Sequence, residues 1–169
     1  MLTPANFKRF FRHLFSTPWH VRRHLPAQTL QAITSAIHDS EASHQGQIRF
    51  VVEGELHPLH ILRGVNPRQR ALKLFSDYAI WDTAQNNGVL IYLLLADHDV
   101  EIIADRGIDA YVGATGWESI CKEMEALFRQ GKFEDAMLAG ITQVGALLTQ
   151  HFPSTNWKEN ELPDTPIVL

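Results

Sequence analysis

Four oxygen-bearing side chains lie close to the ends of two apolar segments in the middle of the chain. Three precede residues 89–96 and one follows residues 100–104, and they are Asp82, Thr83, Asn87 and Asp105. An unbroken apolar run of strand length predicts a β-strand covered on both faces, and His98-Asp99 predicts a hairpin between the two runs. An antiparallel hairpin returns the end of its second strand to the start of its first. We therefore expect the four side chains to converge at one end of a sheet.

Carboxylate, amide and hydroxyl oxygens are the ligands that hard cations prefer, so this cluster predicts a site for Ca²⁺ or Mg²⁺. Gly88 and Gly107 would let the backbone approach a ligand closely, and Arg106 would meet an anion such as phosphate. The same residue types also have an ordinary structural use. Asp, Asn and Thr cap helices and brace turns, and an Arg beside an Asp commonly forms an ion pair. Both interpretations of the cluster remain open at the level of the sequence.

The other chemistry-bearing residues form no complete motif. The histidine pairs are His20 with His24 and His57 with His60; they lack the Glu or Cys of familiar zinc motifs, which favours solvated surface histidines. Cys121 lies in a helical apolar pattern and is expected to be a buried, inert thiol. The sequence contains no GxSxG, P-loop, GxGxxG or paired CxxC motif, so the familiar hydrolase, nucleotide-binding and zinc-ribbon signatures are absent.

Hydrophobic periodicity and turn residues predict the elements that would position the cluster. Helices are expected over residues 26–44, 67–79, 117–129 and 133–151, and strands over residues 48–52, 89–96 and 100–104. A surface loop is expected over 53–66, a linker over 107–116 ending in a helix cap at Thr115 or Gly116, and an extended tail over 154–164 anchored by Trp157 and Leu162. Tyr111 and Trp117 are expected to anchor in the core.

This order of elements predicts the α/β class, as a three-layer α/β/α sandwich with a small mixed β-sheet. The first two strands are separated by a helical crossover, which favours a parallel pair. The hairpin makes the third strand antiparallel.

The first residues of the chain combine apolar and basic side chains. The apolar ones are Phe7, Phe10, Phe11 and Leu14, and the basic ones on the other side are Lys8, Arg9 and Arg12. Over residues 4–15 this spacing predicts a basic amphipathic helix, which would dock on its own domain, on a membrane surface or on a protein partner. The residues predicted to make such a contact are Phe7, Lys8, Arg9, Phe11 and Arg12.

The charge is unevenly distributed along the chain. Of the 15 basic and 19 acidic residues, five basic and no acidic ones precede Asp39, so this part carries +5 and the remainder −9. Such a difference between parts of one small domain is typical of a basic arm joined to an acidic body.

Length and composition predict one domain. A chain of 169 residues with 45% apolar and 20% charged residues can bury a full core. No apolar stretch approaches the roughly 20 residues of a membrane span, and no signal-like start is present. A single cysteine excludes an intrachain disulfide and is compatible with the cytoplasm. We expect a cytoplasmic protein, peripheral at the inner membrane face, with an arm and linker over 1–24, an α/β domain over 25–152 and a tail over 153–169.

A set of short motifs resembles a known family. They are Arg70-Ala71, Phe75, Thr83, Asn87-Gly88-Val89-Leu90-Ile91-Tyr92, Asp105-Arg106-Gly107-Ile108, Trp117 and Gly131-Lys132-Phe133. Over about residues 26–152 the chain resembles the TPM-domain family, often labelled TPM phosphatase. The ending over residues 160–164 is similar to that of short bacterial members without a signal peptide or membrane anchor. The resemblance implies an α/β/α sandwich around a small mixed sheet.

The resemblance also implies where a site would lie. Family-type polar residues would stand at Thr83, Asn87, Asp105 and Gly107, which overlap the cluster identified above. The chain departs from the family pattern at Gln47, where an acidic residue is frequent, and at Ala104, where a glycine is frequent. The first departure would weaken a cation site.

Two functions follow as hypotheses. Family members have been associated with acid phosphatase activity, divalent-cation binding, membrane-complex repair and receptor accessory roles. The first hypothesis is a binding or accessory module that holds a divalent cation at the polar pocket and engages a membrane-linked protein partner. The alternative is a metal-dependent phosphatase acting on phosphomonoesters, in which Asp82 and Asp105 hold the metal and Arg106 orients phosphate. Only the basic N-terminus would suit nucleic acid, and no such partner is expected.

Overall fold

The computed structural model describes residues 24–154 and 160–169 of the chain. The amphipathic helix predicted over residues 4–15, with its contact residues between Phe7 and Arg12, lies outside this part. The predicted tail anchor Trp157 also lies outside it.

The described strands form a mixed sheet in the order β3-β2-β1-β4. They are β1 (Gln47–Glu53), β2 (Gly88–Leu94), β3 (Asp99–Ala104) and β4 (Ile167–Val168). β1 is parallel to β2, with Gln47 opposite Gly88, and is also parallel to β4. β2 is antiparallel to β3, with Val89 opposite Ala104. The parallel crossover and the antiparallel hairpin predicted from the sequence are confirmed.

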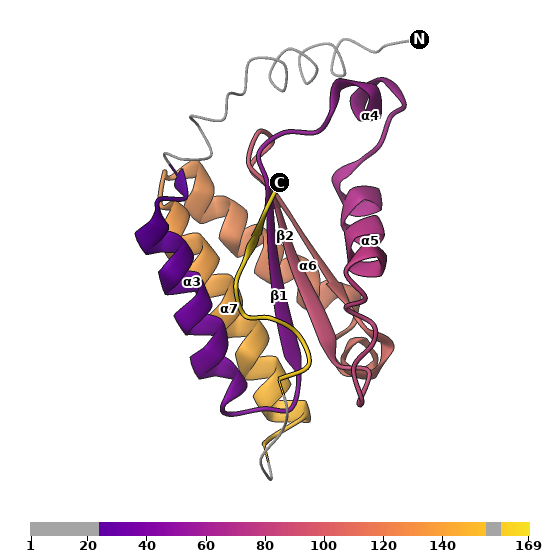
Figure 1. Ribbon diagram of the computed structural model, residues 1–169, viewed down its shortest axis with the longest axis vertical. Helices are drawn as coiled ribbons and strands as arrows, with labels where there is room; N and C mark the ends of the chain where they lie inside the picture. Colours follow the sequence, from indigo (N-terminus) through magenta and orange to yellow (C-terminus); the bar gives the residue numbers. More distant parts are fainter. Residues whose placement is uncertain (1–23, 155–159) are drawn as a thin grey trace.

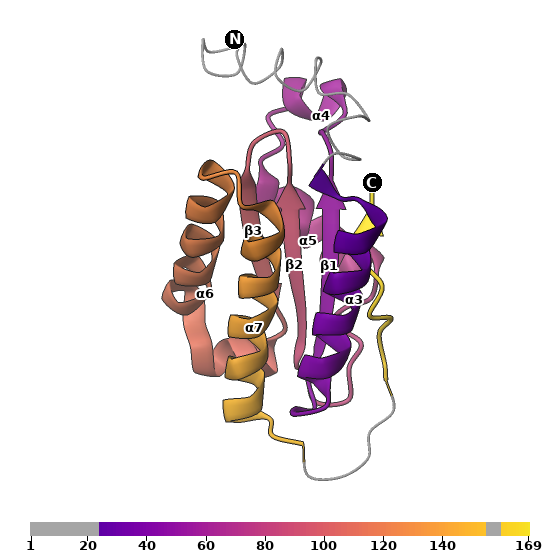
Figure 2. The same ribbon diagram turned by 90° about the vertical axis from the view of Figure 1, so that its left-hand side faces the viewer.

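Helices cover both faces of this sheet. They are α3 (Ala27–Glu41), α4 (Pro58–Leu62), α5 (Pro67–Asp77), α6 (Arg106–Arg129) and α7 (Phe133–His151). α3, α6 and α7 pack on one face, called the α7 face below, and α5 packs on the other, called the α5 face (Figure 1, Figure 2). The α/β/α sandwich predicted from the sequence is confirmed. Across residues 24–154 and 160–169 no helix combines the length and apolar character that crossing a membrane requires.

Side-chain alternation along β2 divides its residues between two cores. Val89, Ile91 and Leu93 join the core under the α7 face, whereas Leu90, Tyr92 and Leu94 join the core under α5. All seven residues of β2 are buried. A strand covered on both faces has no polar alternation, which is why its sequence is an unbroken apolar run.

α6 begins eleven residues earlier than the sequence predicts, at Arg106 rather than Trp117. The segment 107–116, expected to be a linker capped by Thr115 or Gly116, is helical, and Asp105 is the N-cap residue. A kink at Gly113 (φ 67°, ψ 170°) divides the helix into a short first part and a long second part. The prediction failed because glycines at 107, 113 and 116 suggest a flexible loop, whereas Gly113 alone takes a conformation that favours glycine.

Two further local predictions were wrong. The expected loop over residues 53–66 contains α4, because Pro58 suits the first turn of a helix and the His57 ring accepts a hydrogen bond from the Leu59 amide. Tyr111 is not a core residue, since its side chain is 63% exposed and stacks on His151 with 4.7 Å between ring centroids. Trp117 is buried as predicted.

The C-terminal tail is an integral part of the sheet. Its last residues form β4, a strand that the sequence analysis missed because two residues are too short to show a period. The Arg49 guanidinium donates to the carbonyl oxygens of Pro163 and Thr165, and the Leu162 amide donates to the Gln47 side chain at 2.8 Å. Leu162 packs against the core of the α5 face, as the predicted anchor should.

The observed start of α6 after Asp105 and the predicted start after Thr115 or Gly116 imply different effects of substitutions on stability. Asp105→Ala removes the side chain that caps the Arg106 amide and should lower the free energy of unfolding by about 1 kcal/mol, the usual cost of a lost N-cap. Thr115→Ala should change it by less than about 0.5 kcal/mol, because Thr115 is exposed within the helix. Urea unfolding followed by circular dichroism measures both. A larger loss for Thr115→Ala would contradict the observed helix start.

Candidate functional site

Backbone pairing brings three of the four predicted polar residues to one end of the sheet. The Asp105 amide donates to the Gly88 carbonyl at 2.9 Å, which places Asp105 beside the first residue of β2. The Thr83 hydroxyl accepts from the Asn87 amide at 3.1 Å, which ties the preceding loop to the same strand. Asp82 is exposed at the start of this loop. The structure therefore groups Thr83, Asn87 and Asp105.

Only one of the two oxygens of the Asp105 carboxylate has a hydrogen-bond partner among the described residues. Its Oδ1 accepts from the Arg106 amide at 2.7 Å and caps α6. Its Oδ2 is buried and has no hydrogen-bond partner in the described part of the protein. Asp105 follows Ile103 by two residues, so strand alternation directs its side chain to the α5 face. An unpartnered buried carboxylate oxygen is costly and calls for a water molecule or an ion.

Asn87 presents a second set of unpartnered atoms. Its side chain is fully buried, and neither Oδ1 nor Nδ2 has a hydrogen-bond partner within residues 24–154 and 160–169. Asn87 precedes Val89 by two residues and therefore lies toward the α7 face, opposite to Asp105. The hairpin brings the two residues to one end of the sheet, but its pleat separates their side chains.

The two glycines of the predicted site are required by packing. A Cβ at Gly88 would lie 2.0 Å from the Ile80 carbonyl oxygen, and a Cβ at Gly107 would lie 2.4 Å from the Asn86 carbonyl oxygen. Both close approaches are to the protein's own backbone. Arg106 is exposed, and its Nε donates to the Asn86 side chain at 3.2 Å. The ion pair with Asp105 considered at the sequence level is not formed.

The loop over residues 79–87 is held in a strained conformation. Ala79 and Asn86 have positive φ angles of 50° and 53°, which non-glycine residues rarely adopt. The Glu161 carboxylate of the tail accepts from the Ala84 amide at 2.8 Å and braces the loop from outside. A strained backbone conformation is retained only where the surrounding structure enforces it, and such conformations are frequent at functional sites.

A buried carboxylate that the sequence analysis missed lies next to this end of the sheet. The Glu41 carboxylate accepts from the Ile48 amide at 2.8 Å and from the Gln47 side chain at 3.2 Å. Gln47 is opposite Gly88 in the β1–β2 ladder. Glu41 lies near the end of α3, where no sequence signal separates it from solvated helix residues. Its hydrogen bonds satisfy it within the protein.

The opposite end of the sheet holds a buried polar network of Glu53, Arg70 and Tyr92. The Glu53 carboxylate accepts from the Tyr92 hydroxyl at 2.7 Å and from the Arg70 guanidinium at 2.7 and 2.8 Å. Burial, and then the Glu53 charge, raise the pKa of Tyr92 above its usual value, while the hydrogen bond to Glu53 raises the pKa of Arg70. At the other end of the sheet Glu41 and Gln47 are hydrogen-bonded, but Oδ2 of Asp105 has no partner among the described residues.

The remaining chemistry-bearing residues have structural settings. Cys121 is half-buried rather than fully buried as predicted, and its burial raises the pKa of the thiol to about 12, which favours the protonated form at neutral pH. His57 caps α4, and its ring is 6.2 Å from that of His60. His24 stacks on Phe133 with 3.8 Å between ring centroids.

The donor set at the sheet end suits only certain metals. Within the described residues, no group of three or more His, Cys, Asp or Glu side chains is placed to hold a metal ion. A closed zinc site is therefore not formed there. One carboxylate oxygen fits a hydrated hard cation, because Mg²⁺ keeps several water ligands and binds through one or two carboxylates. The Gln85 carbonyl oxygen lies beside Gly107, two residues after Asp105 in the chain.

Comparison with known proteins identifies the family. The sequence profile of the TPM domain matches residues 22–147, so the chain belongs to the TPM-domain family. The NMR structure of BA42 from the psychrophilic bacterium Bizionia argentinensis is similar, with a TM-score of 0.74 and 30% identity over 84% of this chain and 93% of BA42. The N-terminal domain of a P. gingivalis protein shares the fold, with a TM-score of 0.57 and 18% identity over 75% of this chain and 79% of that domain. No curated protein matches the chain.

Gly88 provides a test of the packing role. Gly88→Ala should lower the free energy of unfolding by about 2 kcal/mol or more, because the new Cβ cannot coexist with the Ile80 carbonyl. The loss should be the same with and without added Ca²⁺ or Mg²⁺. Chemical unfolding of the variant in both conditions measures it, with Ser119→Ala on the exposed side of α6 as a control. A loss that disappears when cation is added would instead assign Gly88 to the ligand.

The polar network provides a test that depends on pH. Tyr92→Phe removes the hydrogen bond to a charged acceptor and should cost about 2 kcal/mol at neutral pH. Because the folded-state pKa of Tyr92 is raised, its stabilising contribution is complete below about pH 10 and declines as pH rises and the unfolded chain ionises. The difference in unfolding free energy between wild type and Tyr92→Phe should narrow above about pH 10. Tyr111→Phe, at an exposed tyrosine, should keep the wild-type pH dependence.

Proposed function

We propose that this TPM-domain protein is a binding module that takes up a divalent cation at the sheet end through Asp105. The observation that carries the proposal is the Asp105 Oδ2 atom, which is buried without a partner while Oδ1 caps α6. A buried anionic oxygen is stabilised by a positive ligand more than by any neutral group. A cation at this position would satisfy it.

The surroundings support a hydrated Ca²⁺ or Mg²⁺ ion. The strained loop over 79–87 supplies backbone carbonyl oxygens, including that of Gln85 beside Gly107. These neutral donors add little charge, so the affinity should be modest, in the range of about 10⁻⁴–10⁻³ M typical of sites with few carboxylates. The neutral Gln47 in place of a frequent acidic residue agrees with a weak site.

A metal-dependent phosphatase is less well supported by the same geometry. That mechanism requires a second carboxylate, for which Asp82 was the candidate, and an arginine directed at phosphate. Asp82 is exposed, and Arg106 is engaged with the Asn86 side chain. The proposed module would act through association with a membrane-linked protein, for which the contact residues Phe7, Lys8, Arg9, Phe11 and Arg12 remain a prediction from the sequence.

The test compares two carboxylates by thermal unfolding. Metal-stripped protein is heated with and without Ca²⁺, Mg²⁺, Mn²⁺ or Zn²⁺. An ion at ten times its dissociation constant should raise the free energy of unfolding by about 1.4 kcal/mol. Asp105→Asn keeps an oxygen that can cap α6 but removes the charge, so it should abolish the rise. Asp82→Asn, at the exposed carboxylate, should retain it.

The other outcomes are equally informative. No rise with any ion would contradict the proposal and assign the space beside Oδ2 to an ordered water molecule. Turnover of p-nitrophenyl phosphate is measured in the same samples. Metal-dependent turnover that both variants lose would replace the binding module with the phosphatase.

A further inference from the structure

β3 is an edge strand of the described sheet, and side chains meet its outer edge at Ile102, where Arg68 reaches the carbonyl and the backbone amide is hydrogen-bonded with the Cys121 thiol. The hydrogen bond from the Asp105 amide to the Gly88 carbonyl shows which residues of β3 direct their backbone groups toward β2 and which direct them away. Narrow and wide pairs alternate in antiparallel ladders, so Val100, Ile102 and Ala104 direct their amide and carbonyl groups away from β2. The Arg68 guanidinium donates to the Ile102 carbonyl from this outer side at 3.4 Å, which agrees with a carbonyl that points away from β2.

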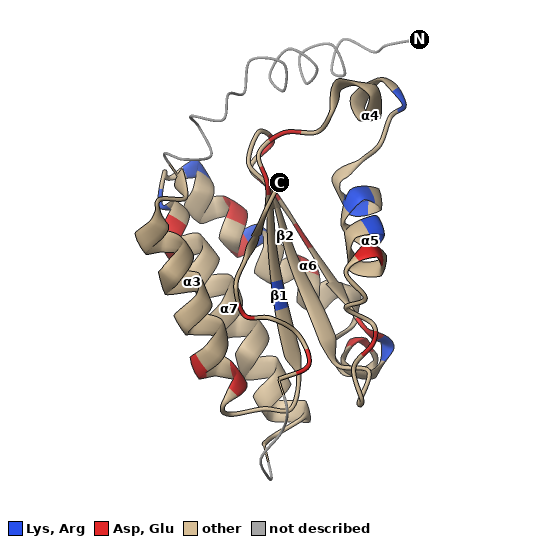
Figure 3. Ribbon diagram, viewed as in Figure 1, with Lys and Arg blue, Asp and Glu red and all other residues tan. Residues whose placement is uncertain are grey.

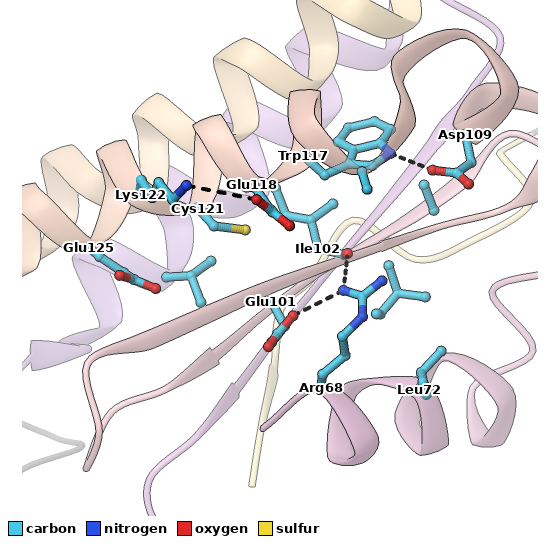
Figure 4. Close-up of a pocket in the computed structure, with 14 residues that line it drawn as sticks. Arg68, Leu72, Glu101, Ile102, Asp109, Trp117, Glu118, Cys121, Lys122 and Glu125 are labelled. Atoms are coloured by element: carbon cyan, nitrogen blue, oxygen red, sulfur yellow. Dashed lines mark hydrogen bonds and ion pairs between the residues drawn. The ribbon is translucent and has the colours of Figure 1, made fainter. Parts of the chain in front are cut away.

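This outer side is the floor of a groove, called the β3 groove below. Its volume is about 510 Å³, and it runs between α5 and α6 along the length of β3. Figure 4 shows Leu72 and Arg68 on the α5 side and Trp117 and Cys121 on the α6 side, with the Ile102 carbonyl between them. Natural proteins blunt or cover exposed strand edges, and an exposed edge can accept an extended peptide as an additional strand.

The walls of the β3 groove carry an excess of negative charge. The acidic residues are Glu101, Asp109, Glu118 and Glu125, and the basic ones are Arg68 and Lys122, which leaves a net charge of −2. Arg68 pairs with Glu101 at 3.1 Å, Lys122 with Glu118 at 3.8 Å, and Glu125 with Arg129, which does not line the groove, at 3.1 Å. The acidic excess lies on α6, whereas α5 carries Arg68, Arg70 and Lys73 against Asp77 (Figure 3).

We propose that the β3 groove binds an extended basic peptide segment of a partner protein, which adds to β3 as a further strand. Main-chain groups of the peptide bond to Val100 and Ala104 and replace Arg68 at the Ile102 carbonyl. Side chains on one face of the peptide contact Trp117, and basic side chains meet Glu118 and Glu125 on α6. The Arg68 side chain is 57% exposed and can move aside.

Charge favours this occupant over a second copy of the chain. Pairing of β3 with β3 from another copy would bring two grooves of net charge −2 together, and like charges at an interface are unfavourable. The peptide site is also separate from the proposed cation site, because none of Thr83, Asn87 and Asp105 lines the groove. The two proposals can therefore fail independently.

The experiment uses three synthetic hexapeptides with the full-length ¹⁵N-labelled protein. They are acetylated and amidated (Lys-Val)₃, (Ser-Val)₃ and (Glu-Val)₃. The basic peptide should shift the amide resonances of Val100, Ile102 and Ala104 and slow their hydrogen exchange. The acidic peptide should bind at least about tenfold more weakly, as complementary charge requires.

Two matched variants on α6 test the role of charge. Glu118→Lys reverses an exposed charge in the groove and should weaken binding of the basic peptide about tenfold. Glu123→Lys, whose carboxylate accepts from Gln143 outside the groove, should leave binding unchanged. Absence of shifts on β3 with every peptide, equal binding of all three, or concentration-dependent dimerisation that occupies β3 would overturn the proposal.

Discussion

Burial of β2 on both faces and along both edges is the constraint on which the rest of the structure depends. All seven residues of β2 are buried, and its backbone groups pair with β1 and β3. A strand without a solvent face requires a helical layer on each side, which α5 and the α3–α6–α7 group provide. The Ile80 carbonyl lies so close to Gly88 that only a glycine can begin the strand.

The buried polar groups at the two ends of β2 differ in whether they have hydrogen-bond partners. Tyr92 brings a hydroxyl into the core of the α5 face, where it donates to the Glu53 carboxylate, which in turn accepts from the Arg70 guanidinium. At the other end, the side-chain amide of Asn87 and the Oδ2 atom of Asp105 have no hydrogen-bond partners in the described part of the protein. Fully satisfied networks stabilise one arrangement of a core, whereas an unsatisfied buried atom calls for a partner such as a water molecule or an ion.

The first part of α6 connects the two surfaces that we assign to ligands. Asp105 caps this helix at the proposed cation site. Asp109, one turn later, accepts from the Trp117 indole at 2.8 Å, and both residues line the β3 groove. The kink at Gly113 lies between Asp109 and Trp117, so this hydrogen bond holds the two parts of the helix together. The cation site and the groove thus share a supporting element while using different side chains.

The sequence by itself determined the class of fold, the parallel and antiparallel strand pairs and the return of Asp105 to the sheet end where Asn87 lies, because hydrophobic period and hairpin geometry are local properties of the chain. Only the tertiary structure decided which atoms of that group are satisfied. It placed Asn87 and Asp105 on opposite faces, bound Arg106 to Asn86 and explained Gly88 and Gly107 by contacts with backbone distant in sequence. It also extended α6 back to Asp105 and recruited residues 167–168 as a strand, since both depend on contacts that no local pattern encodes. The physical reason for this difference is that side chains of separate elements meet only through packing in three dimensions, which local sequence patterns do not encode.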